Sequence, residues 1–331
     1  MQPEITNRVQ VKDIPLVSIC VPTFKHKDWL VRCVESILMQ KTNFKFEILI
    51  GIEYDDDDQY VSKIKAKNDN ASLSIFRNSK ESLIYIEGTR TGRGNMLNLL
   101  RSSKGRYICF CEGDDYWIDS NKLQKQVDVL KEYPEVSLVY TNAKIESDDG
   151  GDYISNSLFY DSNYSSVPIK NQKYFLENNY AILLASIMFR RKNLGERDLE
   201  ELKKYSTGDL PMYIIISGKG DFHYINEACV SYTDHAQGIS KTFGKLKRNI
   251  INYNKMGSLL PYIQASNIKK FNYFQHQFLI VPSFQFMMEM VKRKDSKNVN
   301  FFQFFFVKLK HMKLRYIYYA LKLTYFKLKG I

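Results

Sequence analysis

Short apolar runs alternate with segments of helical spacing through the first 140 residues of the chain. The apolar runs cover residues 16–21, 46–52, 72–76, 107–111 and 136–140. Between them, apolar side chains recur at intervals of three and four in residues 28–39, 95–102 and 123–130, which predicts helices. Strands that alternate with helices in this way are typical of an α/β protein. The pattern therefore predicts a doubly wound, mostly parallel sheet flanked by helices.

The pattern changes in the second part of the chain. Residues 141–170 are rich in Ser, Asn, Asp and Tyr, which predicts a long surface loop. Regular structure is expected to resume with a helix over 172–178 and an apolar strand over 182–189. A helix from Asp209 and two short strands over 222–225 and 228–232 complete the predicted elements.

The composition is that of an ordinary globular protein. The chain has 331 residues, of which 44% are hydrophobic and 25% are charged. No apolar run reaches the roughly 18 residues that a membrane-spanning helix needs, and the first residues do not resemble a secretory signal. The five cysteines lack a metal-binding spacing and are expected to be reduced, buried thiols. These features predict a cytoplasmic protein.

The net charge of +12 is concentrated in the last part of the chain. Residues 241–331 hold 18 Lys and Arg against Glu289 and Asp295, and 16 Phe and Tyr follow residue 270. We therefore expect a near-neutral domain over 1–240 and a basic, aromatic-rich helical region over 241–331. Such a region suits the inner face of a membrane, and packed helices or a homo-oligomer interface are the alternatives. No recognised nucleic-acid-binding motif accompanies the charge, so no nucleic acid is expected.

The strongest chemical signal is a group of acids after the fourth apolar run. The run over 107–111 ends in Glu112, Asp114 and Asp115, with Gly113 allowing the chain to turn. In open α/β sheets, ligands bind at the carboxyl ends of the strands. Because neighbouring carboxylates repel one another, a divalent cation such as Mg²⁺ or Mn²⁺ that bridges to a diphosphate is the favoured explanation. The alternative is a strand exit with solvated acids.

The order of these motifs resembles that of the family 2 glycosyltransferases, over about residues 16–240. The resemblance rests on Pro22-Thr23-Phe24, on Glu47-Ile48-Leu49-Ile50-Gly51, on Gly92-Arg93-Gly94-Asn95, on Glu112-Gly113-Asp114-Asp115, on Gly208-Asp209 and on Tyr232 to His235. It implies a GT-A fold with a nucleotide-binding part over about 16–140 and an acceptor part over about 141–240.

The resemblance also implies a set of site residues. A nucleotide-sugar donor, with a UDP-sugar favoured, would contact Pro22, Thr23, Phe24, Glu53, Arg90, Gly92, Asn95, Glu112 and Asp114. Asp114, Asp115 and His235 would hold the Mn²⁺ or Mg²⁺ ion, and Asp209 would be the general base. The alternative for His235 is a structural role as a hydrogen-bonding residue. Arg93 is a further candidate for the diphosphate, unless the two loop arginines are only solvated.

Departures from the family pattern limit which residues are expected in the site and how many sugars are expected to be added. Four aspartates at 55–58 follow Glu53-Tyr54 where the family often has Asp-Asp-Gly-Ser, and most of them are expected to be solvated. Gly208-Asp209 replaces two adjacent acids, which leaves Asp209 as the candidate base or, alternatively, a helix N-cap. The Gln-x-x-Arg-Trp element of processive members is absent, which favours one sugar added per encounter.

The resulting hypothesis is an inverting, metal-assisted hexosyltransferase. It would move one sugar to a glycan or lipid-linked acceptor during the synthesis of a surface or capsular polysaccharide, as a peripheral protein of the inner membrane face. One alternative is a catalytically silent nucleotide-sugar-binding scaffold. Another is a sugar nucleotidyltransferase, although its Gly-rich, Arg-containing loop is missing after Val21.

Overall fold

The structure is a computed structural model, and it describes most of the chain up to residue 275. The described residues are 4–9, 14–53, 59–64, 67–82, 84–86, 89–147, 158–160, 168–178, 182–235, 252 and 255–275. The aspartates at 55–58 and the basic segment from 276 onward lie outside the described residues.

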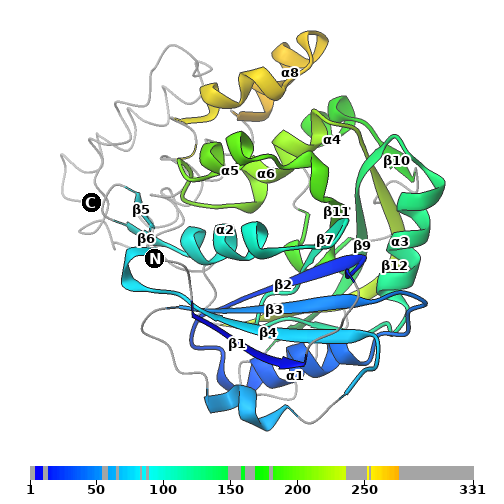
Figure 1. Ribbon diagram of the computed structural model, residues 1–331. Helices are drawn as coiled ribbons and strands as arrows, with labels where there is room; N and C mark the ends of the chain where they lie inside the picture. Colours follow the sequence, from blue (N-terminus) through cyan, green and yellow to red (C-terminus); the bar gives the residue numbers. More distant parts are fainter. Residues whose placement is uncertain are drawn as a thin grey trace, which may run out of the picture.

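A ten-stranded mixed sheet forms the centre of the molecule (Figure 1). Its strands are β1 (Glu4–Val9), β2 (Val17–Thr23), β3 (Phe46–Ile52), β4 (Ala71–Arg77), β7 (Tyr107–Phe110), β8 (Tyr116–Trp117), β9 (Val136–Ser147), β10 (Ile169–Lys170), β11 (Met188–Arg190) and β12 (Asp221–Asp234). The strand order is β1-β4-β3-β2-β7-β11-β9-β12-β10, with β8 paired to β12. Strands β4, β3, β2 and β7 are mutually parallel, whereas β11 is antiparallel to both neighbours. A separate hairpin joins β5 (Ile84–Ile86) and β6 (Thr89–Thr91).

Helices cover both faces of this sheet. They are α1 (Lys27–Leu38), α2 (Arg93–Ser102), α3 (Lys122–Glu132), α4 (Gln172–Asn178), α5 (Glu196–Leu202), α6 (Asp209–Ser217) and α8 (Ile268–Gln275). Short 3₁₀ helices are η1 (Gln59–Lys63), η2 (Lys80–Ser82), η3 (Leu184–Ser186), η4 (Arg191–Asn193), η6 (Met256–Tyr262) and η7 (Ala265–Asn267).

The strands are buried on both sides because successive side chains point to opposite faces. All seven residues of β3 are buried. Ile48 and Ile50 join the core formed with α1 and α3, whereas Leu49 joins the core formed with α2, α4 and α6. A continuous apolar run such as this one is what a strand covered by helices on both faces requires. In Figure 1, α1 lies on one side of the sheet and α2 on the other.

The predicted fold class is confirmed, and several elements have the expected bounds. Strand β3 and helix α4 have the bounds predicted from the sequence. The sequence patterns for α1, α2, α3 and α6 also correspond to helices. The sheet curls because β11 and the long pair β9 and β12 continue it beyond the parallel strands.

Three sequence-based predictions were wrong. The apolar stretch 182–189 contains the three-residue 3₁₀ helix η3, where the Ser186 hydroxyl and N–H both donate to the Leu183 carbonyl, and only its end belongs to β11. Residues 141–147 continue β9 instead of starting a loop, since they pair with β12. The two strands predicted over 222–232 form one strand, β12, with a register irregularity between Ile225 and Ala228.

Residues 255–275 pack against the sheet domain. The side chains of Met256, Leu259, Phe271 and Phe274 are fully buried in the core that also contains α4 and α6. The part of the 241–331 region that the structure describes therefore contributes to the body of the protein. Within the described residues, no helix has the length and apolarity needed to span a membrane.

Candidate active site

The acidic turn lies at the carboxyl ends of the parallel strands, where it was expected. The N–H of Gly113 donates to the carbonyl of Pro22 (3.2 Å), which ties the end of β7 to the end of β2. A Cβ on Gly113 would lie 2.8 Å from both Thr23 Oγ1 and His26 Nδ1. Glycine is therefore needed here for the close approach of the two strand ends.

Two histidines converge on the Asp114 carboxylate. Asp114 Oδ2 lies 3.1 Å from His235 Nε2 and 3.7 Å from His26 Nε2. Burial opposes ionisation of Asp114, but the hydrogen bond with His235 and the proximity of His26 outweigh it and lower the pKa of Asp114. The ring of His235 also packs against Trp29, with 4.5 Å between the ring centroids. Asp114 is thus held ionised among imidazoles that come from the ends of β2 and β12.

Asp115 points to the neighbouring strand. Its Oδ1 accepts the backbone N–H of Thr233 (3.0 Å), and the Thr233 hydroxyl donates to the Asp114 carbonyl (2.5 Å). Burial, followed by the charges of Asp114 and Glu112, raises the pKa of Asp115 well above its usual value. Asp115 Oδ2 is buried without a hydrogen-bond partner among the described residues. The side chain therefore connects β12 to the acidic turn and leaves one oxygen unused.

Glu112 and Asp209 approach each other from different elements. Asp209 is the first residue of α6, and Gly208 is the N-cap, so the alternative of Asp209 as N-cap was wrong by one position. Burial, with contributions from Asp114 and Asp209, raises the pKa of Glu112 to about 8. Three carboxylates thus lie close enough to influence one another, as expected of a site that receives a cation.

A buried arginine lies beside these acids. Arg93 is in the first turn of α2 and is only 5% exposed, so the solvated alternative was wrong for this residue. Burial lowers its pKa to about 10, and the charge of Asp209 partly opposes this shift. Arg93 Nη1 lies 3.0 Å from Met96 Sδ, and Arg93 Nε is buried without a partner in the described part of the chain.

Two other buried polar atoms at this end of the sheet are unsatisfied within the described residues. They are the hydroxyls of Thr23 and Tyr213. Burial, with the charges of Asp209 and Glu112, raises the pKa of Tyr213 well above its usual value. Unsatisfied buried groups are uncommon in folded proteins, and here they are consistent with a site that completes its hydrogen bonds with a ligand.

The predicted donor-binding residues occupy several different positions. Pro22, Thr23 and Phe24 follow one another at the end of β2, where Lys25 has a left-handed φ of 61°, and Glu53 follows β3. Phe24 is 40% exposed, whereas Glu53 is 5% exposed.

The predicted donor-binding residues in and near the loop before α2 differ in their surroundings. Gly92 is the N-cap of α2, and a Cβ there would meet nothing within 4 Å. Asn95 is buried, and its amide donates to the Gly51 carbonyl (2.7 Å) and accepts from Asn78 (3.0 Å). These bonds give Asn95 a structural function in joining α2 to the ends of β3 and β4. Arg90 lies in β6, and the structure does not describe its side chain.

The donor set around Asp114 fits a divalent cation when a diphosphate supplies further ligands. Asp114 Oδ2 and His235 Nε2 are adjacent, and Asp115 Oδ2 is an unused buried acceptor. No group of three His, Cys, Asp or Glu side chains among the described residues is arranged to hold a metal by itself. Cations bound together with nucleotide phosphates commonly use only one or two carboxylates of the protein.

Sequence reasoning missed His26, Thr233 and Tyr213. His26 follows Pro22-Thr23-Phe24 directly, so its place after a strand was a usable signal. Thr233 lies within the Tyr232 to His235 segment, but its bonds to the acidic turn depend on the pairing of β8 with β12. Tyr213 lies one helical turn after Asp209, and its apolar neighbours give it the appearance of a core residue.

Comparison with known proteins assigns this chain to a class. The family model described as glycosyl transferase family 2 matches residues 18–199, more than half of the chain, and the chain belongs to this family. It is 34% identical over 135 residues to the Escherichia coli UDP-Glc:alpha-D-GlcNAc-diphosphoundecaprenol beta-1,3-glucosyltransferase WfaP. That match covers 40% of this chain and 48% of WfaP. The chain spans less than half the length of the curated relatives it matches.

Solved structures confirm the GT-A fold. S. aureus TarS 1-349 in complex with UDP-GlcNAc has a TM-score of 0.57 at 12% identity, covering 89% of this chain and 76% of that one. The mannosyltransferase PcManGT from Pyrobaculum calidifontis, in complex with GDP-Man and Mn²⁺, has a TM-score of 0.51 at 12% identity. That match covers 95% of this chain and 85% of PcManGT. At these identities the likeness concerns the fold alone.

Proposed function

We propose that this protein is an inverting, metal-assisted glycosyltransferase that moves one sugar from a UDP-sugar to a glycan or lipid-linked acceptor. The observation that carries the proposal is the convergence of Glu112, Asp114 and Asp209 beside His235 and Arg93 at the carboxyl edge of the sheet. The substrates named for WfaP support a UDP-sugar donor, a lipid-linked acceptor and a role in polysaccharide synthesis. The ligands of TarS and PcManGT support a nucleotide-sugar donor, and the Mn²⁺ in PcManGT supports a divalent cation, for which Mg²⁺ is the alternative.

The roles of the residues follow from their positions. Asp114 and His235 would hold the cation, and Asp115 is a further candidate ligand through its unused oxygen. When bound, a divalent cation supplies positive charge for the diphosphate that leaves. Arg93 adds a buried positive charge on the side of Asp209, and Thr23 offers a hydroxyl at the end of β2. In a low-dielectric setting, such fixed charges stabilise the developing charge of the leaving group.

Asp209 is positioned to act as general base. The acceptor hydroxyl attacks the anomeric carbon and transfers its proton to the Asp209 carboxylate as the bond to the diphosphate breaks. Attack from the side opposite the leaving group inverts the anomeric configuration. The start of α6 favours a carboxylate at this position through the helix dipole.

The proposal also divides the chain into a nucleotide-binding part, an acceptor part and a basic region. The nucleotide-binding part would cover about 16–140 and the acceptor part about 141–240. The basic region, whose larger part lies outside the described residues, would attach the enzyme to the inner face of a membrane.

One substitution tests the catalytic assignment. Asp209→Asn keeps the shape of the side chain but removes the proton acceptor, so transfer should fall by about 10²-fold or more. Donor affinity, measured by calorimetry with UDP-sugars and Mn²⁺, should change little. Asp128→Asn, at an exposed position on α3, is the matched control and should keep wild-type activity. Unchanged turnover in Asp209→Asn would exclude Asp209 as base, and donor binding without transfer in the wild type would favour the scaffold alternative.

A further inference from the structure

A cavity lies at the opposite edge of the sheet from the acidic turn. It has a volume of about 980 Å³ and is lined by residues at the starts of β2 and β7, the end of β11 and parts of α2 and α5. Arg106 precedes β7 directly, whereas Glu112 follows its end. At about 3.3 Å per residue, six residues of extended chain separate the two by about 20 Å. The cavity is therefore distinct from the candidate active site.

Positive charge dominates the rim of this cavity. Lys104, Arg106, Arg191 and Lys192 all line it and are exposed. Within the described part of the chain, none of these four side chains forms an ion pair with a carboxylate. Four unpaired cations around one cavity repel one another and attract anions.

The remaining charged groups of the lining are already engaged. Glu196 is the one acid among the described lining residues, and Arg101 pairs with both Glu196 and Glu200. Arg190 is buried, and its guanidinium donates to the carbonyls of Val136 (2.7 Å), Leu130 (2.5 Å) and Tyr133 (3.0 Å). Lys203 also pairs with Glu200, so Arg101 and Lys203 together balance the two glutamates. No further carboxylate of the described lining remains to neutralise the four exposed cations.

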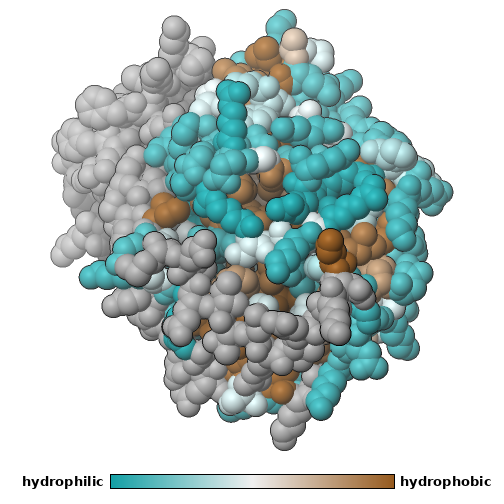
Figure 2. Space-filling model, viewed as in Figure 1, coloured by the Kyte–Doolittle hydropathy of each residue, from teal (hydrophilic) through white to brown (hydrophobic). Residues whose placement is uncertain are grey.

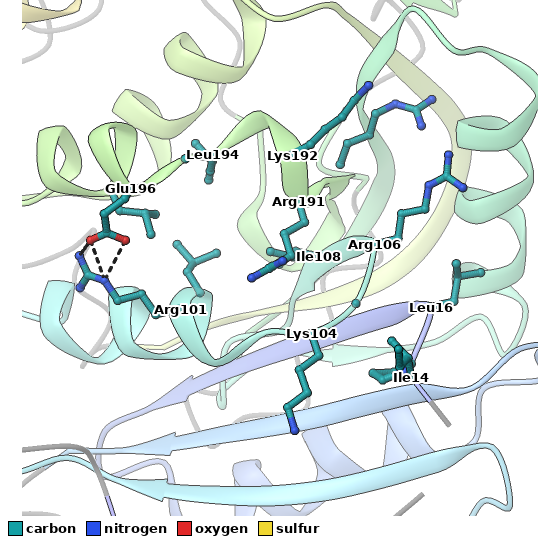
Figure 3. Close-up of a pocket in the computed structure, with 16 residues that line it drawn as sticks. Ile14, Leu16, Arg101, Lys104, Arg106, Ile108, Arg191, Lys192, Leu194 and Glu196 are labelled. Carbon is teal, nitrogen blue, oxygen red and sulfur yellow. Dashed lines mark hydrogen bonds and ion pairs between the residues drawn. The ribbon is translucent and has the colours of Figure 1, made fainter. Parts of the chain in front are cut away.

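Strand pairing places two of the arginines side by side. Strand β11 runs antiparallel to β7, and the N–H of Arg191 donates to the Arg106 carbonyl (3.0 Å). Figure 3 shows Arg191 beside Ile108, with Lys104 and Arg106 on the adjoining chain and the Arg101–Glu196 pair at the other end. Only the backbones are adjacent, because the Arg191 side chain extends toward Ile108 whereas the Arg106 side chain points away from it (Figure 3). Arginine forms bidentate hydrogen bonds with phosphate, so the Arg191 guanidinium suits this anion.

The cavity also has an apolar floor. Leu100, Ile108 and Leu199 are buried side chains of the lining, and the exposed Ile14 stands at its edge. In Figure 2, hydrophilic side chains surround small areas of hydrophobic surface near the centre of this face. Its volume lies within the range of roughly 300–1,000 Å³ typical of small-molecule sites. A cationic rim above an apolar floor suits a ligand with both an anionic and an apolar part.

We infer that this cavity binds an organic phosphate ester. The phosphate pairs with Arg191, and the organic part lies over Leu100 and Ile108. Lys104, Arg106 and Lys192 add positive potential around the rim. Two sources share this chemistry: a soluble phosphate ester such as a sugar phosphate, and the headgroup of an anionic phospholipid. The site does not depend on Asp209 or on the catalytic reaction.

The test compares full-length protein with the double variant Arg106→Glu/Arg191→Glu. The first arm measures binding of glucose 1-phosphate and glycerol 3-phosphate by calorimetry, and the second measures sedimentation with vesicles that contain phosphatidylglycerol. Lys173→Glu/Lys269→Glu, at exposed positions on α4 and α8, is the control with the same change in charge. The double variant should bind at least tenfold more weakly than this control in one arm, and that arm identifies the source. UDP-sugar binding should stay unchanged in both variants.

Two results would overturn the inference. One is no binding in either arm at an ionic strength of about 0.15 M, where surface charges are screened beyond about 8 Å. The other is equal binding by the double variant and the control, which would assign any attraction to overall charge. If the double variant melts at a lower temperature than the control, the single changes Arg106→Gln and Arg191→Gln are measured in its place, with the same criteria.

Discussion

The guanidinium of Arg93 occupies the space in which a side chain at Gly208 would lie. A Cβ on Gly208 would be 1.4 Å from Arg93 Nη1 and 2.4 Å from Cζ. The backbone of Gly208 has φ −104° and ψ −31°, which any residue adopts. The arginine side chain, and not the backbone of the turn, therefore opposes a side chain at position 208. The family pattern has two adjacent acids where this chain has Gly208-Asp209. The glycine leaves room for the buried positive charge of Arg93 beside the candidate base.

The first prediction concerns this contact. Gly208→Ala should displace the Arg93 guanidinium, because the new methyl group has no other space. We expect the free energy of unfolding to fall by about 1–3 kcal/mol, as for other overpacked sites. Sugar transfer should fall as well, because the displaced charge lies next to Asp209. Thermal denaturation and a transfer assay measure the two effects.

A double variant provides the control. In Arg93→Ala the space beside residue 208 is empty, so adding Gly208→Ala should cost little further stability. If Gly208→Ala is equally destabilising in both backgrounds, the clash with Arg93 is not its cause. A wild-type melting temperature for the single variant would contradict the prediction directly.

The second prediction concerns Asn95. Its side chain joins the Gly51 carbonyl to Asn78 in a buried setting, so Asn95→Ala leaves buried groups unsatisfied. We expect a loss of about 2 kcal/mol in the free energy of unfolding, measured by urea denaturation. Asn98→Ala, on the same helix and with bonds only to the side chains of Asn78 and Ser82, should lose less. Equal losses would indicate that Asn95 has no special structural function.

The periodicity of the sequence was sufficient for the elements that form the parallel sheet. Apart from Glu47, residues 46–52 lack polar side chains on either face of the strand, and helices cover both sides, so pattern and structure agree. Gly113 and the acids around it also correspond to a strand end at the expected edge. The sequence pattern was sufficient to predict an element wherever its buried residues recur with the period of a strand or a helix.

Other features depended on contacts between distant segments. The stretch 182–189 is apolar and mostly buried. A short apolar run of this kind occurs both in a buried 3₁₀ turn and in a buried strand, so the periodicity of the sequence does not distinguish the two. Residues 141–147 are polar, yet pairing with β12 makes them a strand. The approach of Arg93 to Gly208 joins segments 115 positions apart in the chain, which no local pattern records.

The third prediction concerns the metal. Asp114→Ala removes the carboxylate on which His26 and His235 converge, so metal-dependent donor binding and sugar transfer should both be lost. The fold should persist, because the backbone bonds from Gly113 to Pro22 and from Asp115 to Glu112 do not involve this side chain. Calorimetry of UDP-sugar binding with Mn²⁺ and with a chelator measures the effect. A variant that keeps Mn²⁺-dependent donor binding would exclude Asp114 as a ligand.

The last prediction concerns the basic region and where it separates from the folded body. Residues 276–331 carry 11 Lys and Arg against two acids, and each basic side chain near an anionic surface contributes about 1 kcal/mol of binding. A protein that ends at Gln275 should therefore lose sedimentation with anionic vesicles while it keeps UDP-sugar binding. A protein that ends at residue 240 should be much less stable, since it lacks the buried Phe271 and Phe274.

The full-length variant Lys308→Gln/Lys310→Gln/Lys313→Gln/Arg315→Gln keeps the chain length and separates charge from truncation. Vesicle binding should weaken in this variant and should decrease for the wild type as salt rises, because screening shortens the reach of surface charge. The control changes four lysines of the sheet domain to glutamine, at the exposed positions Lys41, Lys67, Lys131 and Lys173, and should bind as the wild type does. If vesicle binding survives truncation at Gln275, the attachment belongs to the folded body, and packing or oligomerisation becomes the favoured role of the basic region.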